Sequence, residues 1–200
     1  MNQNTKDRRV RKTKRLLLEG LTELMKAKSI NDITVRELAD RVDINRSTFY
    51  LHYQDIYDMI KHIEDDIMNQ LNEVLGPMPT SNDPIQSEEE IENIIKSIFE
   101  FLYENRAVCR VLLGPNGDIK FLNKVLDNVS ERINFFLRSY MTTGYTNFDL
   151  ALINKFFVTG CIGLVKYWLE SDDETFEKTD IPHMTSLFMD LLKNGLRVKM

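Results

Sequence analysis

The stretch TVRELADRVDINRSTFYLHY, at residues 34–53, contains two short helical patterns separated by a break. Thr34 and Glu37 have the spacing of a capping box, in which the Thr hydroxyl accepts from the Glu amide and the Glu carboxylate returns to the Thr amide. The apolar positions that follow recur at the spacing of one buried helix face: Val35, Leu38, Ala39 and Val42. The stretch therefore begins with a short, capped helix.

The first helical pattern breaks at Asp43, a residue type that tolerates the left-handed backbone of a tight turn. Asn45 can cap a second short helix, which Phe49 is expected to anchor to the first one. Two short helices joined by about three residues match a helix-turn-helix, whose second helix enters the major groove of DNA. The residues expected to reach DNA from this unit are Thr34, Asn45, Arg46, Ser47, Thr48, Tyr50 and His52.

The segment before the helix-turn-helix is strongly basic. Residues 6–15 hold seven cations and one anion. Cations at a helix N-terminus oppose the helix dipole, so helix stability does not explain them, whereas a polyanionic partner does. We expect Arg9, Arg11 and Lys12 to contact DNA phosphates or a minor groove; a solvated basic tail is the alternative. The first eight residues are polar and are expected to be disordered, with an amphipathic helix over about residues 9–28.

The charge of the chain is unevenly distributed. Residues 1–62 carry 13 Lys and Arg against 9 Asp and Glu, whereas residues 63–200 carry 13 against 22. A basic head on an acidic body suggests that the head alone meets a polyanion, although a chance fluctuation of surface charge would look the same.

Composition narrows the class of protein. Hydrophobic residues make up 42% and charged residues 28% of the chain, and Gly (8) and Pro (5) are scarce, which favours a helical globular protein. The best apolar stretch, residues 156–169, is short and interrupted by Lys166, and the basic N-terminus precedes no signal-peptide core. We expect a cytoplasmic protein without membrane contact. Cys109 and Cys161 lack zinc or disulfide spacing, so we expect two buried thiols rather than a redox sensor, and neither metal nor cofactor.

The rest of the chain reads as further helices without strand alternation. A long helix is expected from Asp55 to Val74, ending before the loop that begins at residue 76. Further helices are expected over about residues 88–104, 107–113, 119–141, 148–170 and 183–198. The predicted fold is all-α with about nine helices: a three-helix helix-turn-helix head at residues 1–54, supported by the helix from residue 55, and a helical-bundle ligand and dimerisation domain at residues 55–200.

Residues 33–53 resemble the DNA-binding head of the TetR/AcrR family, and the resemblance extends over about residues 9–65. It implies phosphate or base contacts by Thr48 and Tyr50 and a phosphate contact by the cap Asn45. It further implies sequence selection by Arg46 and Ser47 and an aromatic-type phosphate contact by His52. The helix at residues 157–169, which ends in Trp-Leu, more weakly resembles regulators of dihydroxyacetone-kinase operons.

Two positions depart from this family pattern. Asp43 stands where the family usually has Gly, which a left-handed Asp can replace at modest cost. Ile56 stands where a Lys often opens the next helix and binds phosphate, so one anchoring contact is expected to be lost. The dense N-terminal cations are expected to compensate.

The resemblance also implies a homodimer on a palindromic operator and a small-molecule inducer that releases it. We expect a dimer interface that includes Phe157, Gly160, Leu164, Trp168, Phe188 and Leu192, and an inducer pocket lined by Phe99, Tyr103, Phe121, Phe135, Tyr140 and Phe156. For both sets the alternative is an intrachain core, because an apolar stripe at helical spacing is more often core than site.

No catalytic motif occurs in the sequence. His52, His62 and His183 are far apart, and the chain lacks a metalloprotease, nucleophile-elbow or phosphate-loop pattern, so we expect no enzyme. The expected function is sequence-specific DNA-binding regulation of transcription, by default repression. The alternative is a helical adaptor that has lost specific DNA binding. The operator, the regulated genes, the inducer and the sign of regulation are left open.

Overall fold

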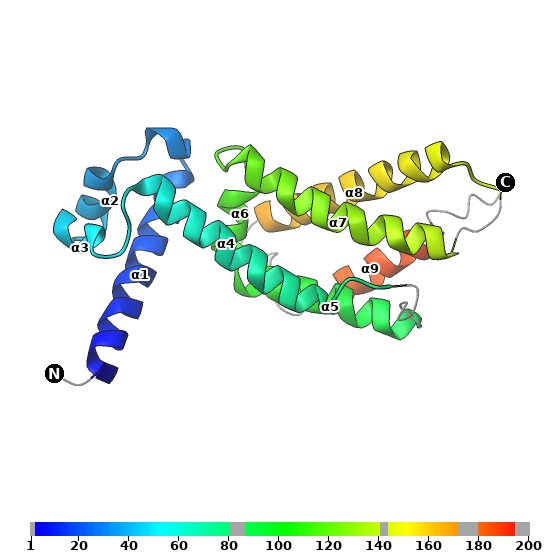
Figure 1. Ribbon diagram of the computed structural model, residues 1–200, viewed down its shortest axis with the longest axis horizontal. Coiled ribbons are helices and arrows are strands. Elements are labelled where there is room, and N and C mark those ends of the chain that lie inside the picture. Colours follow the sequence, from blue (N-terminus) through cyan, green and yellow to red (C-terminus); the bar gives the residue numbers. More distant parts are fainter. Residues whose placement is uncertain (1–2, 81–86, 141–143, 172–179, 195–200) are drawn as a thin grey trace. The chain divides into compact units, whose positions relative to one another are not determined.

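The computed structural model describes residues 3–80, 87–140, 144–171 and 180–194, which form nine α-helices and one short 3-10 helix (Figure 1). The all-α prediction is confirmed. The helices in chain order are α1 (Gln3–Met25), η1 (Ile30–Asp32), α2 (Val35–Arg41), α3 (Arg46–Tyr50), α4 (Ile56–Leu75), α5 (Glu88–Glu104), α6 (Arg106–Leu112), α7 (Ile119–Tyr140), α8 (Asn147–Glu170) and α9 (Ile181–Asn194).

The chain divides into two compact units. The first comprises Met1–Ile67 with Val111–Phe121, and the second comprises Met68–Arg110 with Leu122–Met200. The first unit takes in more of the chain than the head expected at residues 1–54. The reason is that Ile56, Met59 and Ile60 of α4, together with Val111, are buried in the core that the helix-turn-helix needs.

The core of the first unit is built from one face of each helix. Its buried members include Leu17, Leu21 and Met25 of α1, Leu38 of α2, Phe49 of α3 and Met59 of α4. Burying such side chains contributes about 1.5–3 kcal/mol each, which is why helices as short as α2 and α3 hold their shape.

Helix α1 begins earlier than the sequence analysis expected. The helix starts at Gln3, so the prediction of disorder up to residue 8 is wrong for residues 3–8. The first buried side chain of α1 is Leu17, and no described side chain from Arg8 to Leu16 is buried. The N-terminal half of α1 is therefore a helical extension that continues beyond the core.

The second unit packs an aromatic cluster between three helices. The ring of Phe99 on α5 meets Trp168 of α8 edge-on with centroids 5.1 Å apart, and it meets Phe188 of α9 at 5.0 Å. Asn154 Nδ2 of α8 donates to Ser130 Oγ of α7 at 3.1 Å. These contacts connect all four long helices of this unit.

Arginine side chains close two helix ends in the second unit. The guanidinium of Arg132 on α7 donates to the carbonyls of Leu75 at 3.1 Å and Gly76 at 2.8 Å, at the C-terminal end of α4. Arg106 of α6 donates to the carbonyls of Leu169 and Ser171, at the end of α8. Carbonyls at helix C-termini lack intrahelical partners, so these donors satisfy groups that would otherwise need water.

Helix α8 has a capping box at its N-terminus and an apolar composition along its length. Thr146 and Asp149 form a complete capping box, and hydrogen bonds from the Thr146 hydroxyl and amide hold the pKa of Asp149 below its usual value. Within Asn147–Glu170 one window has a mean hydropathy of 1.6 and is 22% buried, so by length and composition α8 could cross a membrane. A single helix of this kind is weak evidence for a membrane span, because core helices of soluble proteins have the same length and composition.

Candidate nucleic-acid interface

The helix-turn-helix is held by local hydrogen bonds. Thr34 Oγ1 accepts from the amide of Glu37 at 3.2 Å, so the Thr half of the predicted capping box is confirmed. The Glu37 carboxylate accepts from Lys28 Nζ at 2.5 Å, which connects α2 to the turn after α1. This contact sets the start of α2 against the end of α1.

The turn between α2 and α3 adopts a left-handed conformation. Asp43 has φ 53°, the only positive φ outside glycine among the described residues. The Ile44 amide then donates to the Ala39 carbonyl at 3.0 Å, so the chain is tied back to α2 directly after the turn. The prediction that Asp43 replaces the family glycine with a left-handed backbone is confirmed.

Asn45 caps α3 with its side-chain carbonyl. Asn45 Oδ1 accepts from the Ser47 amide at 2.9 Å and from the Ser47 hydroxyl at 2.9 Å. The predicted cap is confirmed, and the two bonds divide the polar groups. The amide Nδ2 of Asn45 is left to donate outward, whereas the Ser47 hydroxyl, its proton already used, presents lone pairs as an acceptor.

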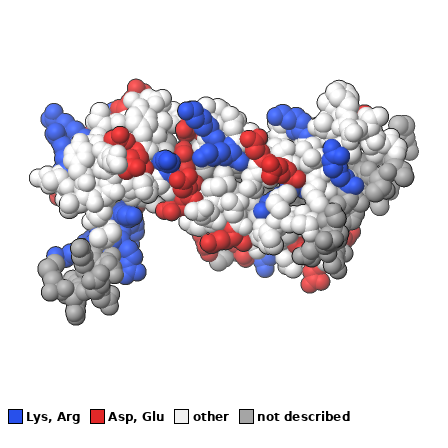
Figure 2. All heavy atoms as spheres, viewed as in Figure 1, with Lys and Arg blue, Asp and Glu red and all other residues white. Residues whose placement is uncertain are grey.

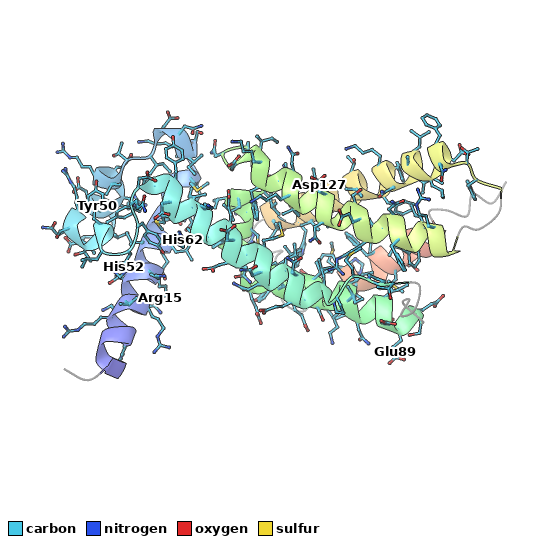
Figure 3. All side chains as sticks on the ribbon, viewed as in Figure 1. Arg15, Tyr50, His52, His62, Glu89 and Asp127 are labelled. Atoms are coloured by element: carbon cyan, nitrogen blue, oxygen red, sulfur yellow. The ribbon has the colours of Figure 1, made fainter. Side chains whose placement is uncertain are left out.

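Helix α3 turns one side to the core and one to solvent. Phe49 is fully buried, and its ring lies 5.7 Å from that of Tyr53. Arg46 and Ser47 are exposed, and Thr48 is half-buried. Tyr50, which is labelled in Figure 3, is 58% exposed. The buried ring fixes the rotation of a five-residue helix that could not form alone, and its donors therefore keep a defined direction.

A basic and aromatic group flanks the end of α3. His52 is half-buried, and Lys14 Nζ of α1 lies 5.8 Å from the centroid of the Tyr53 ring, within cation–π range. Burial, and then the charge of Lys14, lower the pKa of His52 below its ordinary value. His52 is thus neutral at pH 7, where it can donate one hydrogen bond and accept another.

The start of α4 carries two acids and no cation. The side chain of Ile56 is 4% exposed and lies in the core of the first unit. Asp55 Oδ1 accepts from the Asp58 amide at 2.8 Å, and Asp58 Oδ2 accepts from the Gln54 amide at 2.9 Å. Because carboxylates occupy these amides, the N-terminus of α4 repels a phosphate. The cap by Asp55 and the missing Lys were predicted from the sequence, whereas the contact of Asp58 with the Gln54 amide was not.

Several exposed cations of the first unit lie along the N-terminal half of α1, and others lie elsewhere on the unit (Figure 2). Arg8, Arg9, Arg11, Lys12 and Arg15 are exposed, and four of them, Arg9 excepted, line one shallow surface depression. Arg15 Nε lies 3.5 Å from Glu19 Oε1. Among the described residues no acidic side chain is ion-paired with Arg8, Arg11 or Lys12, so these three charges are available to a partner.

The six aromatics expected to line a pocket lie in different surroundings. Phe99 is 1% exposed in the aromatic cluster of the second unit, Phe121 is buried in the first unit, and Phe156 is 72% exposed. Tyr103 and Phe135 are half-buried, and the side chain of Tyr140 lies outside the described residues. Phe99 and Phe156 thus depart from the expectation of a pocket, because one fills a core and the other faces solvent.

The residues expected at a dimer interface also differ in their exposure to solvent. Phe157, Trp168 and Phe188 are buried within the chain, so little of their area is left for a partner. Leu164 and Leu192 are half-buried and Gly160 is exposed. The exposed face of α8 holds further apolar side chains: Phe156 and Tyr167, which were also expected near the interface, and Phe148 and Leu152, which were not.

The thiols and acidic groups suggest no chemistry at this interface. Burial raises the pKa of Cys109 to about 12 and that of Cys161 to about 11, so both stay protonated thiols at neutral pH. Within the described parts of the chain, no three His, Cys, Asp or Glu side chains are placed to hold a metal ion.

Comparison with known proteins identifies the family. Residues 17–63 match the family model described as "Bacterial regulatory proteins, tetR family". Residues 89–194, more than half of the chain, match the TetR model described as "Transcriptional regulator C-terminal region". The chain belongs to the TetR family. It is therefore a DNA-binding transcriptional regulator, and the resemblance read from residues 33–53 is confirmed.

Individual relatives of this TetR-family regulator are distant. It is 20% identical over 154 residues to the "Uncharacterized HTH-type transcriptional regulator YxbF" of Bacillus subtilis (strain 168), and it spans only 39% of that protein's length. A TetR-like transcriptional regulator from Rhodococcus sp. RHA1 superposes with a TM-score of 0.67 at 17% identity, over 92% of this chain and 96% of that one. The "Dihydroxyacetone kinase operon activator DhaS" superposes with a TM-score of 0.50 at 14% identity, over 90% and 96%. At identities this low, the superpositions establish a shared fold and nothing more specific.

Proposed function

We propose that this regulator is a homodimeric repressor that reads a palindromic operator with α3 and is released by a small molecule. The observation that carries the proposal is the division of α3 into a fully buried anchor, Phe49, and an exposed side that presents Arg46, Ser47 and Tyr50. A reader of the major groove needs this combination of a fixed helix and outward polar groups.

The chemistry of the exposed groups suggests their roles. Arg46 presents a guanidinium suited to the paired acceptors of a guanine edge, and Ser47 presents an acceptor that suits an amino group. The Asn45 amide and the hydroxyls of Thr48 and Tyr50 suit phosphate oxygens. In this proposal Arg46 and Ser47 select the sequence, while the other three set the position of α3.

Two α3 helices must be joined to read two half-sites, and the exposed face of α8 supports a dimer. One face of α8 is exposed at residues that recur at spacings of three and four: 148, 152, 156, 160, 163 and 167. Phe148, Phe156 and Tyr167 are 70%, 72% and 79% exposed. A Cβ added at Gly160 or Gly163 would meet no atom within 4 Å, so a partner helix can approach closely there.

The inducer belongs to the second unit, where Tyr103 and Phe135 are the half-buried aromatics among the predicted lining residues. Its binding would act by favouring a spacing of the two α3 helices that no longer fits both half-sites. The proposal places the protein in the cytoplasm, without a catalytic role. Whether repression or activation results is tested by a reporter gene, since the superposable DhaS is named an activator.

The test of DNA reading begins with selection of oligonucleotides from a random pool by the full chain. A palindromic consensus is expected. The Tyr50→Phe variant should then lose about 1–3 kcal/mol of specific binding, or about 5- to 150-fold in affinity. Tyr57→Phe is the matched control, since Tyr57 is also 58% exposed but its hydroxyl donates to Asn31 within the chain. Equal affinities for both variants and wild type would refute the role of Tyr50.

The test of the dimer is sedimentation of a pair of α8 variants. Phe156→Glu places a charge at the centre of the exposed apolar face and should yield a monomer. Ala151→Glu adds the same charge to the same helix beside that face and should leave the dimer intact. A wild-type chain that sediments as a monomer at micromolar concentration would refute the dimer.

A further inference from the structure

Helix α1 extends in the N-terminal direction beyond the core of the first unit, which stabilises its C-terminal half. Residues 3–15 lie before Leu17, the first buried side chain among those described for this helix. At 1.5 Å per residue these 13 residues form about 19 Å of helix. An isolated helix of this length is marginal in water, and the cations here also oppose the helix dipole. The extension therefore has a charge pattern that intrachain packing does not account for.

Four cations of the extension lie on one face. Arg8, Arg11, Lys12 and Arg15 are related by spacings of three and four, so they lie on one side of the helix, and together they line a single surface depression. Lys14 lies off this face, over the Tyr53 ring. Four like charges on one face repel each other, and that repulsion is relieved when anions are bound.

The spacing of this face suits a nucleic-acid strand. From Arg8 to Arg15 the helix rises about 10 Å, and one strand of B-DNA places a phosphate about every 3.4 Å along its axis, so about three phosphates face this segment. The start of α4, in contrast, offers no cation to a phosphate. The start of α4 carries Ile56 in the core and the carboxylates of Asp55 and Asp58 on its amides.

We propose that residues 3–15 form a helical clamp on the phosphates of duplex DNA beside the half-site that α3 reads, with Arg8, Arg11 and Lys12 as the contacts. This inference rests on the proposed function. The clamp carries no sequence information. It supplies the salt-dependent part of the affinity that the N-terminus of α4 does not provide, and it acts as a helix rather than as a flexible arm in a minor groove.

The experiment compares two triple variants of the full chain. Arg8→Gln, Arg11→Gln and Lys12→Gln remove the proposed contacts. Lys96→Gln, Lys120→Gln and Lys124→Gln remove the same charge from exposed sites outside α1 and form the matched control. Fluorescence anisotropy with the selected operator duplex, measured from 50 mM to 500 mM salt, yields the slope of log affinity against log salt for each.

The clamp predicts a loss from that slope of about 2.7 per protomer for the α1 variant, at about 0.9 per phosphate. At 0.1 M salt the affinity should fall by about 100- to 500-fold for each protomer bound, and the deficit should shrink as salt rises, while the preference for operator over scrambled duplex is retained. The control variant should keep the wild-type slope. Circular dichroism melts of all variants report whether the fold is intact.

Two further arms test the geometry. Thr13→Pro keeps every charge but interrupts the helix, and a proline there can still begin the helix that carries Leu17 into the core. It should lose most of the clamp's slope, and wild-type binding by this variant would refute a helical clamp. Trimming the duplex to the half-sites should lower the wild-type affinity to that of the α1 variant.

The outcomes separate the two proposals. If the wild type prefers no sequence, the proposed function fails, and the clamp fails with it. If the wild type is specific and the α1 variant matches the control variant, the clamp alone is refuted. Binding to phosphatidylglycerol vesicles that depends on the same three residues, with unchanged DNA affinity, would also refute it in favour of a membrane contact.

Discussion

The close approach of α1 to α2 at Gly20 allows a quantitative test of the head's packing. A Cβ added at Gly20 would lie 2.2 Å from Cγ1 of Val42 and 3.1 Å from Cδ1 of Leu38. The first distance is far inside van der Waals contact. Gly20→Ala therefore requires the half-buried Val42 to rotate or α2 to move away from α1, and Leu38, fully buried, restricts that movement.

The expected cost of Gly20→Ala follows from two opposing terms. Forcing a methyl into a packed core costs about 1–3 kcal/mol. Replacing a helical glycine by alanine returns about 0.5–1 kcal/mol through lower backbone entropy in the unfolded chain. The net loss in unfolding free energy is about 1–2 kcal/mol. Each kcal/mol lowers the Tm of a unit of about 60–100 residues, the size of the first unit, by about 4–8 °C.

The cause is isolated by a double-mutant cycle with Val42→Ala, which removes the clashing methyl. Urea titration followed by far-UV circular dichroism measures the unfolding free energy of the wild type, both single variants and the double variant. The unfolding free energy of the double variant should exceed the value expected from adding the two single-variant losses by about 1 kcal/mol or more. Additivity within about 0.3–0.5 kcal/mol would show that Gly20 and Val42 do not interact, and the packing argument would be wrong.

Three further outcomes test individual contacts. Phe49→Ala should cost about 3–5 kcal/mol of unfolding free energy in urea titration and abolish operator binding, because the anchor of α3 is lost; Asn45→Ala, which removes only the cap, should cost about 0.5–2 kcal/mol in the same assay. Arg132→Met should lower the urea midpoint by an amount equivalent to about 1–3 kcal/mol, since the carbonyls at the end of α4 lose their donors, and an unchanged midpoint would mean that water replaces them fully. Because the pKa of His52 is lowered in the folded chain, the unfolded chain binds a proton at higher pH than the folded chain does. The unfolding free energy should therefore fall as pH drops below about 6.5 and level off below the native pKa. His52→Gln should flatten this part of a pH series, and identical profiles of variant and wild type would contradict the assignment.

The helix-turn-helix could be predicted from the sequence because the interactions that shape it are local. The Thr34 cap, the turn at the left-handed Asp43 and the Asn45 cap satisfy backbone groups with partners two to five residues away along the chain. Residue type and spacing are sufficient for such contacts. Periodicity likewise predicted each long helix, since an apolar face at helical spacing has few other uses in a chain without strand alternation.

What each apolar face packs against was decided by the tertiary structure. Phe99 and Phe156 have the same residue type and both lie at helical spacing, yet one is enclosed by Trp168 and Phe188 while the other is 72% exposed. Spacing identifies a face of a helix, but only the packing of distant segments shows whether that face is covered.

The same limit applies to the DNA-binding head. The sequence determined that residues 6–15 are basic and that position 56 carries Ile in place of Lys. Only the folded chain shows that the helix carrying this run begins at Gln3 and that Ile56 is buried in the core beside two acids that accept from backbone amides. Charge and capping are properties of short segments, whereas burial and the direction of a helix face depend on contacts between residues far apart in the chain.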